Sequence, residues 1–187
     1  MWRSVKKASE ITLVFDKSGS MDGKPLAEAK AGAKAFLATL DPRDQVTLVF
    51  FDDQVYPPIG PVEVGAGRGQ LEQRIDGAIA SGGTALYDAV IAAHGALAQR
   101  LRANPHRIHA VVVMTDGVDE NSTQGLDLAL REVTVEGEHA VTVFTIGYGA
   151  GANAGVLGQL AERSRGTFSR GSLDDIKQVY RDIATFF

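Results

Sequence analysis

The chain has 187 residues, of which 44% are hydrophobic and 22% are charged, and its formal net charge is −4 at pH 7. This balance is typical of one globular domain, so it excludes disordered, collagen-like and coiled-coil classes; without a basic excess, it also disfavours a nucleic-acid partner. Cysteine is absent, which excludes disulfides, thiolate metal sites and a cysteine nucleophile.

Nearly continuous apolar runs predict the main strands. Such runs, rather than alternating ones, are typical of parallel strands whose two faces are both covered by helices. The segment 55–64 contains three prolines and fits only an edge strand or a loop. A short final strand is expected at 167–169. The main predicted strands lie at 11–15, 46–51, 108–115 and 140–146.

Apolar residues at helical spacing fill the intervals between these strands. Pro25 falls in the first turn of the earliest helix, where its missing N–H costs nothing, and Pro105 ends the longest one. The predicted helical stripes span 26–40, 71–79, 86–101, 126–133, 156–161 and 176–183. The alternation of strands and helices predicts a doubly wound α/β fold.

The ends of the chain and its hydropathy lead to expectations about its organisation. We expect an N-terminal tail over 1–9 and one domain over 10–187, cut from a longer protein. No apolar run reaches the roughly 18 residues that a membrane helix needs. The first nine residues are basic and polar rather than apolar, so we expect a soluble chain without a membrane span or secretory signal.

Oxygen-bearing side chains lie in three loops at the edge of the predicted sheet. In an open parallel sheet, ligands bind at the carboxyl ends of the strands. Two carboxylates and three hydroxyls, with no nitrogen or sulfur, favour Mg²⁺, Mn²⁺ or Ca²⁺ over Zn²⁺ or Cu²⁺. These candidate metal ligands are Asp16, Ser18, Ser20, Thr84 and Asp116.

Three segments, in their order and spacing, resemble the metal-ion-dependent adhesion site (MIDAS) of von Willebrand factor type A (vWA) domains. They are Asp16-Lys-Ser-Gly-Ser20, Gly83-Thr84 and Thr115-Asp116-Gly117. The resemblance extends from Ile11 to the end of the chain. It implies a mostly parallel six-stranded sheet with one antiparallel edge strand and helices on both faces.

The resemblance also implies a role for each ligand. Ser18, Ser20 and Thr84 would coordinate the ion, Thr84 either directly or through water. Asp16 and Asp116 would hold it partly through bridging waters. One position would stay open for an Asp or Glu of a partner protein, because hydroxyl ligands leave the charge of the cation under-compensated. We therefore expect a non-catalytic protein-binding module with Mg²⁺, or Mn²⁺ or Ca²⁺, as its cofactor.

Three further stretches, 23–26, 84–89 and 179–183, are similar to bacterial vWA modules fused to extracytoplasmic solute-binding domains. An extracytoplasmic compartment, within a larger envelope protein, is therefore one expectation, although the residues themselves leave the compartment open. In relatives, ligand binding at the ion can shift the last helix, which would be 173–187 here.

Alternative interpretations of the same residues stay open. Asp16 and the two serines could cap the following helix. A Mg²⁺-dependent phosphatase similar to haloacid dehalogenases would also use Asp16, but such enzymes place a second Asp where this chain has Ser18. A structural assembly module with an idle metal site would use the same ligands. Four acidic residues at the rim could tune the field, bind a second ion or act as solvated caps, with caps favoured; they are Asp22, Asp88, Asp119 and Glu120.

Two glycine-rich segments resemble nucleotide-binding patterns. The segment 147–152 fits G-x-G-x-x-A, but it follows a late strand and lacks the acidic residue expected about 20 positions further on. We interpret it as a tight turn. The segment 19–25 is one residue short of a phosphate loop and has Pro25 in place of Ser or Thr, so we exclude it.

Overall fold

A computed structural model describes residues 6–172 and 174–186 of the chain. Its sheet has six strands in the order β3-β2-β1-β4-β5-β6. All neighbouring strands are parallel except β2 and β3, which are antiparallel. The strands are β1 (Ser9–Asp16), β2 (Gln45–Phe51), β3 (Ile59–Glu63), β4 (Ile108–Thr115), β5 (Val141–Tyr148) and β6 (Phe168–Gly171). The expected doubly wound, mostly parallel sheet with one antiparallel edge strand is confirmed.

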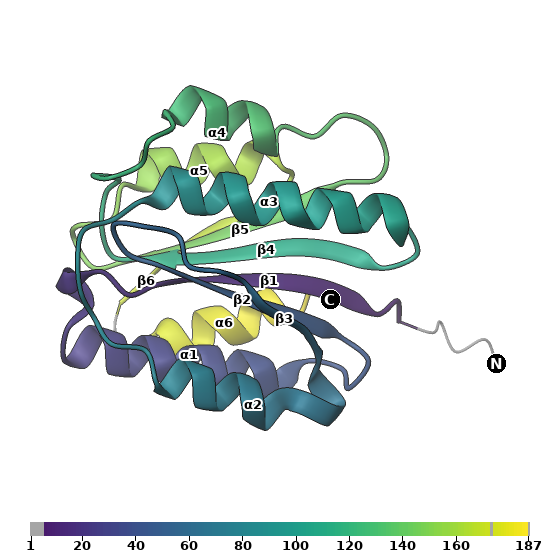
Figure 1. The fold of residues 1–187 in the computed structure, drawn as a ribbon, viewed down its shortest axis with the longest axis horizontal. Coiled ribbons are helices and arrows are strands. Elements are labelled where there is room, and N and C mark those ends of the chain that lie inside the picture. Colours follow the sequence, from purple (N-terminus) through teal and green to yellow (C-terminus); the bar gives the residue numbers. More distant parts are fainter. Residues whose placement is uncertain (1–5, 173, 187) are drawn as a thin grey trace.

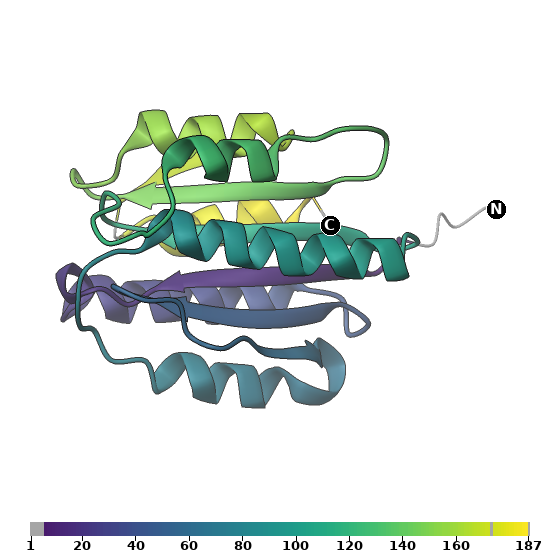
Figure 2. The same ribbon diagram turned by 45° about the horizontal axis from the view of Figure 1, so that its top comes forward.

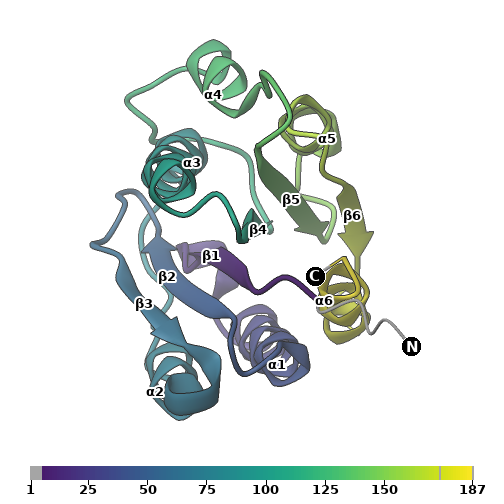
Figure 3. The same cartoon turned by 90° about the vertical axis from the view of Figure 1, so that its right-hand side faces the viewer.

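Helices cover both faces of this sheet (Figures 1 and 3). One face is covered by α1 (Lys24–Thr39), α2 (Val64–Asp76) and α6 (Ile176–Ala184), and the other by α3 (Leu86–Ala103), α4 (Leu126–Val133) and α5 (Ala154–Arg163). A short 3-10 helix, η1 (Gly19–Met21), follows β1. In the described part of the chain, no helix has the length and apolar character that crossing a bilayer requires.

Strand β1 shows why the apolar runs are continuous. Leu13 and Phe15 belong to the core cluster that includes α1, α2 and α6. Val14, between them, belongs to the cluster with α3, α4 and α5. All three side chains are fully buried. A central strand between two helical layers needs an apolar side chain on each face, so its sequence does not alternate.

The structure corrects the predicted end of the second helix. The stripe at 71–79 included Ile79, but α2 ends at Asp76, and the Ile79 side chain is 77% exposed in the loop that follows. Gly77, a residue of low helix propensity, follows Asp76 and caps the end of the helix. The expected domain boundaries stay a prediction: β1 begins at Ser9, while residues 1–5 and 187 lie outside the described residues.

Tyr180 fixes α6 against α1. Its ring lies 5.7 Å from that of Phe36, centroid to centroid, and the residue is fully buried. Its hydroxyl has no hydrogen-bond partner among the described residues. Burial raises the pKa of this hydroxyl above its ordinary value, so the group stays neutral and is desolvated without compensation.

We expect Tyr180→Phe to raise the free energy of unfolding by about 1 kcal/mol, because a buried hydroxyl without a partner carries a desolvation cost. Urea denaturation of both proteins measures the difference. As a matched control, Tyr56→Phe removes a hydroxyl that donates to Asp52 at 2.8 Å and should lower stability. A loss of stability in Tyr180→Phe would contradict the claim that the Tyr180 hydroxyl has no hydrogen-bond partner.

Candidate metal site

The pairing of β1 with β4 brings the first and third candidate loops together. The two strands are parallel and adjacent, and Phe15 lies opposite Met114. Asp16 and Thr115 follow these residues directly, at the same edge of the sheet. Thr115 Oγ1 donates a hydrogen bond to Asp16 Oδ2 at 2.6 Å. The two loops are therefore joined through side chains as well as through the sheet.

Asp16 is a buried carboxylate with neutral partners. Its Oδ1 accepts a hydrogen bond from the backbone N–H of Ser18 at 2.8 Å, and none of its side chain is exposed. The pKa of Asp16 is raised to about 6: burial is the largest cause and the nearby Asp116 adds to it, while the hydrogen bonds from Thr115 and Ser18 lower it. The site thus holds a negative charge that it does not neutralise.

The two serines connect Asp16 to Asp116. Ser18 has an extended backbone, and its Oγ lies 3.1 Å from Ser20 Oγ. Ser20 Oγ in turn donates to Asp116 Oδ1 at 3.0 Å. Burial raises the pKa of Asp116 as well. Four of the five predicted site residues therefore form one continuous cluster.

Thr84 lies in the second candidate loop, which precedes α3. The N–H of Gly19 donates to the carbonyl of Gly82 at 2.9 Å, which holds this loop against η1. Thr84 is 4% exposed, and its Oγ1 would lie 3.5 Å from a Cβ built on Gly117. Its hydroxyl makes no hydrogen bond with the described residues. A polar oxygen without a partner thus lies beside the residue that follows Asp116.

This donor set fits a hard divalent cation. It consists of carboxylate and hydroxyl oxygens, the ligand types that Mg²⁺, Mn²⁺ and Ca²⁺ prefer. Across residues 6–172 and 174–186, no three His, Asp or Glu side chains gather closely enough to hold a metal, so the hydroxyls are needed to complete the set. Within the same ranges, no Lys, Arg or His forms an ion pair with Asp16 or Asp116.

A loop after β4 holds Thr84 and the start of α3 in place. Asn121 Oδ1 accepts from the backbone N–H of Thr84 at 3.0 Å. Asp119 Oδ1 accepts from the N–H of Tyr87 at 3.1 Å, and Ser122 Oγ from that of Asp88 at 3.0 Å. Asp119 is therefore a helix cap, as favoured from the sequence. The role of Asn121 was not predicted; the run of Asp, Asn and Ser before α4 was its only signal.

Asp88 also ties α3 to this loop. Its carboxylate accepts from the backbone N–H groups of Thr123, at 2.8 Å, and Gln124, at 3.0 Å. The two other acidic residues of the predicted rim, Asp22 and Glu120, are exposed.

A buried ion pair next to the site was not predicted from the sequence. Lys17 Nζ pairs with the carboxylate of Asp52, which is 1% exposed and follows β2. Asp52 also accepts from the hydroxyls of Tyr56, at 2.8 Å, and Ser81, at 3.2 Å. Lys17 stands between Asp16 and Ser18. The ion pair therefore fixes the loop that carries Asp16, Ser18 and Ser20, here called the metal loop, to the end of β2. The partners are separated by 35 positions, and no local pattern indicates the pairing.

The glycine-rich segment at 147–152 forms a turn beside the site. Gly149 has a φ of 74°, which favours glycine. A Cβ on Gly151 would lie only 2.6 Å from the carbonyl oxygen of Asp116, so this turn must lack a side chain to approach the third loop. These contacts explain the glycines as elements of a tight turn.

The family model that describes the von Willebrand factor type A domain matches residues 10–182. The chain belongs to the vWA family.

Relatives and solved structures agree with this assignment. The uncharacterized protein sll0103 of Synechocystis is 29% identical over 159 residues, which cover 85% of this chain and 36% of that protein. Human inter-alpha-trypsin inhibitor heavy chain H4 is 26% identical, covering 93% of this chain and 20% of its own length. The chain thus spans about a third or less of these relatives.

The vWA fold recurs in solved structures of low identity. A von Willebrand factor type A protein from Catenulispora acidiphila superposes with a TM-score of 0.82 at 20% identity, covering 95% of this chain and 42% of that one. Proximal thread matrix protein 1 of the mussel byssus, with a zinc-occupied MIDAS motif, gives 0.74 at 18% identity, covering 96% and 46%. Manganese-loaded TRAP protein of Plasmodium vivax gives 0.68 at 18%, covering 95% and 74%.

We expect Asp16→Asn to stabilise the metal-free vWA domain at neutral pH. The pKa of Asp16 rises from 3.8 in the unfolded chain to about 6 in the folded one, so its contribution to stability is complete below pH 3.8 and is lost as the pH rises through 6. Two pKa units correspond to about 3 kcal/mol. In chelator, the advantage of the Asn variant should therefore grow by about that amount between pH 3.5 and pH 7.

Denaturant midpoints across this pH range measure the effect. Asp22→Asn is the matched control, because it changes an exposed carboxylate of the same loop, and it should show no such growth. If the stability difference between Asp16→Asn and wild type were the same at both pH values, the claim that the pKa of Asp16 is raised by burial would be contradicted.

Proposed function

We propose that the chain is a non-catalytic protein-binding module that depends on a divalent cation. Asp16, Ser18, Ser20, Thr84 and Asp116 hold Mg²⁺, or Mn²⁺ or Ca²⁺. The ion supplies an electrophile that accepts a carboxylate from an Asp or Glu of a partner protein. The observation that carries this proposal is the hydrogen-bonded cluster from Asp16 to Asp116, next to the unpartnered hydroxyl of Thr84.

The electrostatics of the cluster support this proposal. Both carboxylates are buried enough for burial to raise their pKa, and their hydrogen-bond partners are neutral. A cation among them relieves this imbalance, and neutral hydroxyl ligands leave part of its charge for an outside acid. The metal-loaded relatives from mussel and Plasmodium carry the same family fold.

The surface around the site supports a protein partner. Two large apolar side chains on the loops that carry the site are well exposed, Ile79 and Val118. Ile79 lies on the loop that leads to Thr84, and Val118 follows Asp116 by two residues. These side chains add apolar contact area beside the polar site, and protein interfaces combine apolar and polar surface in this way.

The surroundings of Asp16 support binding rather than hydrolysis. Both of its oxygens accept hydrogen bonds, from Ser18 N–H and Thr115 Oγ1, and the residue is fully buried. Ser18 occupies the position where a phosphatase of the haloacid dehalogenase type has its acid/base. Turnover of p-nitrophenyl phosphate that is lost in Asp16→Asn would favour the hydrolase instead.

We further propose an extracytoplasmic location within a larger envelope protein. Similar folds include an aerotolerance-related membrane protein of Bacteroides fragilis, the vWF domain of the type V pili tip protein Mfa5 of Porphyromonas gingivalis and the PilB minor pilin of Streptococcus sanguinis. Fractionation of cells that express the full-length protein tests this location.

We expect Mg²⁺ or Mn²⁺ to stabilise the protein. A site filled at 100 times its Kd adds about 2.7 kcal/mol to the free energy of unfolding. Thermal melts in metal and in chelator measure this shift, and Asp116→Ala should abolish it. Asp22→Ala, an exposed acid of the same loop, should retain it. A shift that survives Asp116→Ala would contradict the assigned site.

A further inference from the structure

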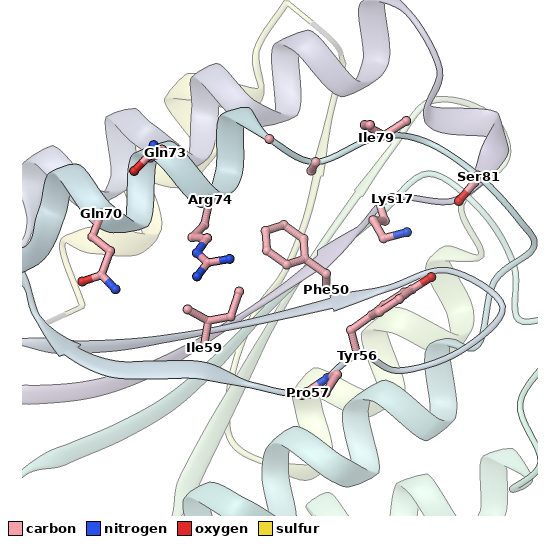
Figure 4. A pocket seen from close by; sticks show the side chains of 12 residues that line it. Lys17, Phe50, Tyr56, Pro57, Ile59, Gln70, Gln73, Arg74, Ile79 and Ser81 are labelled. Atoms are coloured by element: carbon pink, nitrogen blue, oxygen red, sulfur yellow. The ribbon is translucent and has the colours of Figure 1, made fainter.

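A groove opens beside the metal loop, between α2 and the β2–β3 edge of the sheet (Figure 4). Its volume is about 1000 Å³. Lys17 and Ser81 lie at one end, Phe50 at the centre and Gln70 towards the other end (Figure 4). The groove is therefore large enough to hold several residues rather than a single side chain.

One end of the groove is formed by residues that are close in the chain to the proposed metal ligands. Lys17, which lines it, is the residue between Asp16 and Ser18, and its carbonyl accepts from the N–H of Ser81 at 2.9 Å. Ser81 also lines the groove and stands three positions before Thr84. A chain that leaves the metal towards α2 would therefore pass Lys17 and Ser81 to reach this groove.

The charge in the groove is positive and is carried by one residue. Its charged lining residues are Lys17 and Arg74, and it has no acidic ones. The charge of Lys17 is compensated by Asp52. The exposed Arg74 guanidinium makes no ion pair or hydrogen bond with the described residues, and it points into the groove (Figure 4).

The floor and one rim of the groove are apolar. Ile59 lies beneath the Arg74 guanidinium and Phe50 beside it, and Ile79 stands at the rim on the loop after α2 (Figure 4). The exposure of Ile79, 77%, is unusual for a large aliphatic side chain. An apolar side chain of a partner would be desolvated between these residues.

We propose that this groove binds an extended acidic segment of the partner protein, in continuation of the metal site. One carboxylate of the segment binds the cation, an apolar side chain lies over Phe50 and Ile59, and a second carboxylate pairs with Arg74. The proposal rests on the metal-dependent function proposed above and adds the composition of the segment that it recognises. Arg74 is a specificity-determining residue, because it selects the second acid.

The probe for this proposal is a random peptide library displayed on phage. It is selected on the immobilised domain in Mn²⁺ and eluted with EDTA, so that only metal-dependent binders are recovered. We expect the recovered peptides to share one acidic residue, then an apolar residue and a second acidic residue at constant spacing. A consensus peptide is then titrated against variants of the domain.

Arg74→Glu should weaken the consensus peptide about tenfold or more, the usual scale for a hydrogen bond to a charged group. Replacing the second acid of the peptide by Lys should restore binding to this variant. Arg68→Glu is the matched control: Arg68 lies on the same helix, pairs with Glu72 at 3.3 Å and does not line the groove. It should bind the original peptide normally. Arg74→Gln provides a milder variant should charge reversal disturb folding.

The outcomes separate this proposal from the one on which it rests. EDTA-eluted peptides with a single acid and equal affinity for wild type and Arg74→Glu would overturn the groove and leave the metal-dependent function standing. Recovery of no EDTA-eluted peptide would overturn both proposals. Loss of binding in Arg68→Glu as large as in Arg74→Glu would reduce the effect to net charge and overturn the role of Arg74.

Discussion

The parallel pairing of β1 with β4 is the constraint on which the site depends. It brings the loops that carry Asp16 and Asp116 to one edge of the sheet, where the Thr115–Asp16 hydrogen bond and the Ser18–Ser20–Asp116 contacts connect them. The cluster concentrates negative charge in a partly buried place. Burial of a charged group costs free energy unless it is paired, and this cost makes the site receptive to a cation.

Other parts of the fold serve to hold this arrangement. Asn121 fixes the backbone of Thr84, and Asp119 caps the start of α3. On the opposite side, the buried pair of Lys17 and Asp52 attaches the first loop to β2. The same Lys17 side chain forms part of the groove wall (Figure 4), so one residue connects the loop of Asp16 and Ser18 with the groove. The turned view shows the loops of this edge gathered beyond the carboxyl ends of the strands (Figure 2).

Much of this arrangement could be predicted from the sequence. The strands are local runs of apolar residues. Four candidate ligands follow from their place after these runs, Thr84 from its place before a predicted helix, and all five from the family resemblance. The contacts that complete the site are of another kind. Lys17 and Asp52, or Thr84 and Asn121, are more than 30 positions apart, and their pairing depends on the finished fold. Ile79 shows the limit of periodicity: its spacing fits a helical stripe, but α2 ends before it and leaves it exposed.

Anomalous diffraction from crystals grown with Mn²⁺ would test the central claim most directly. The account predicts one strong manganese peak at the edge of the sheet, bound by oxygens contributed by all three loops, with Ser18, Ser20 and Thr84 among them. A manganese ion bound elsewhere, or an edge at which Asp16, Thr84 and Asp116 lie too far apart to share one ion, would contradict it.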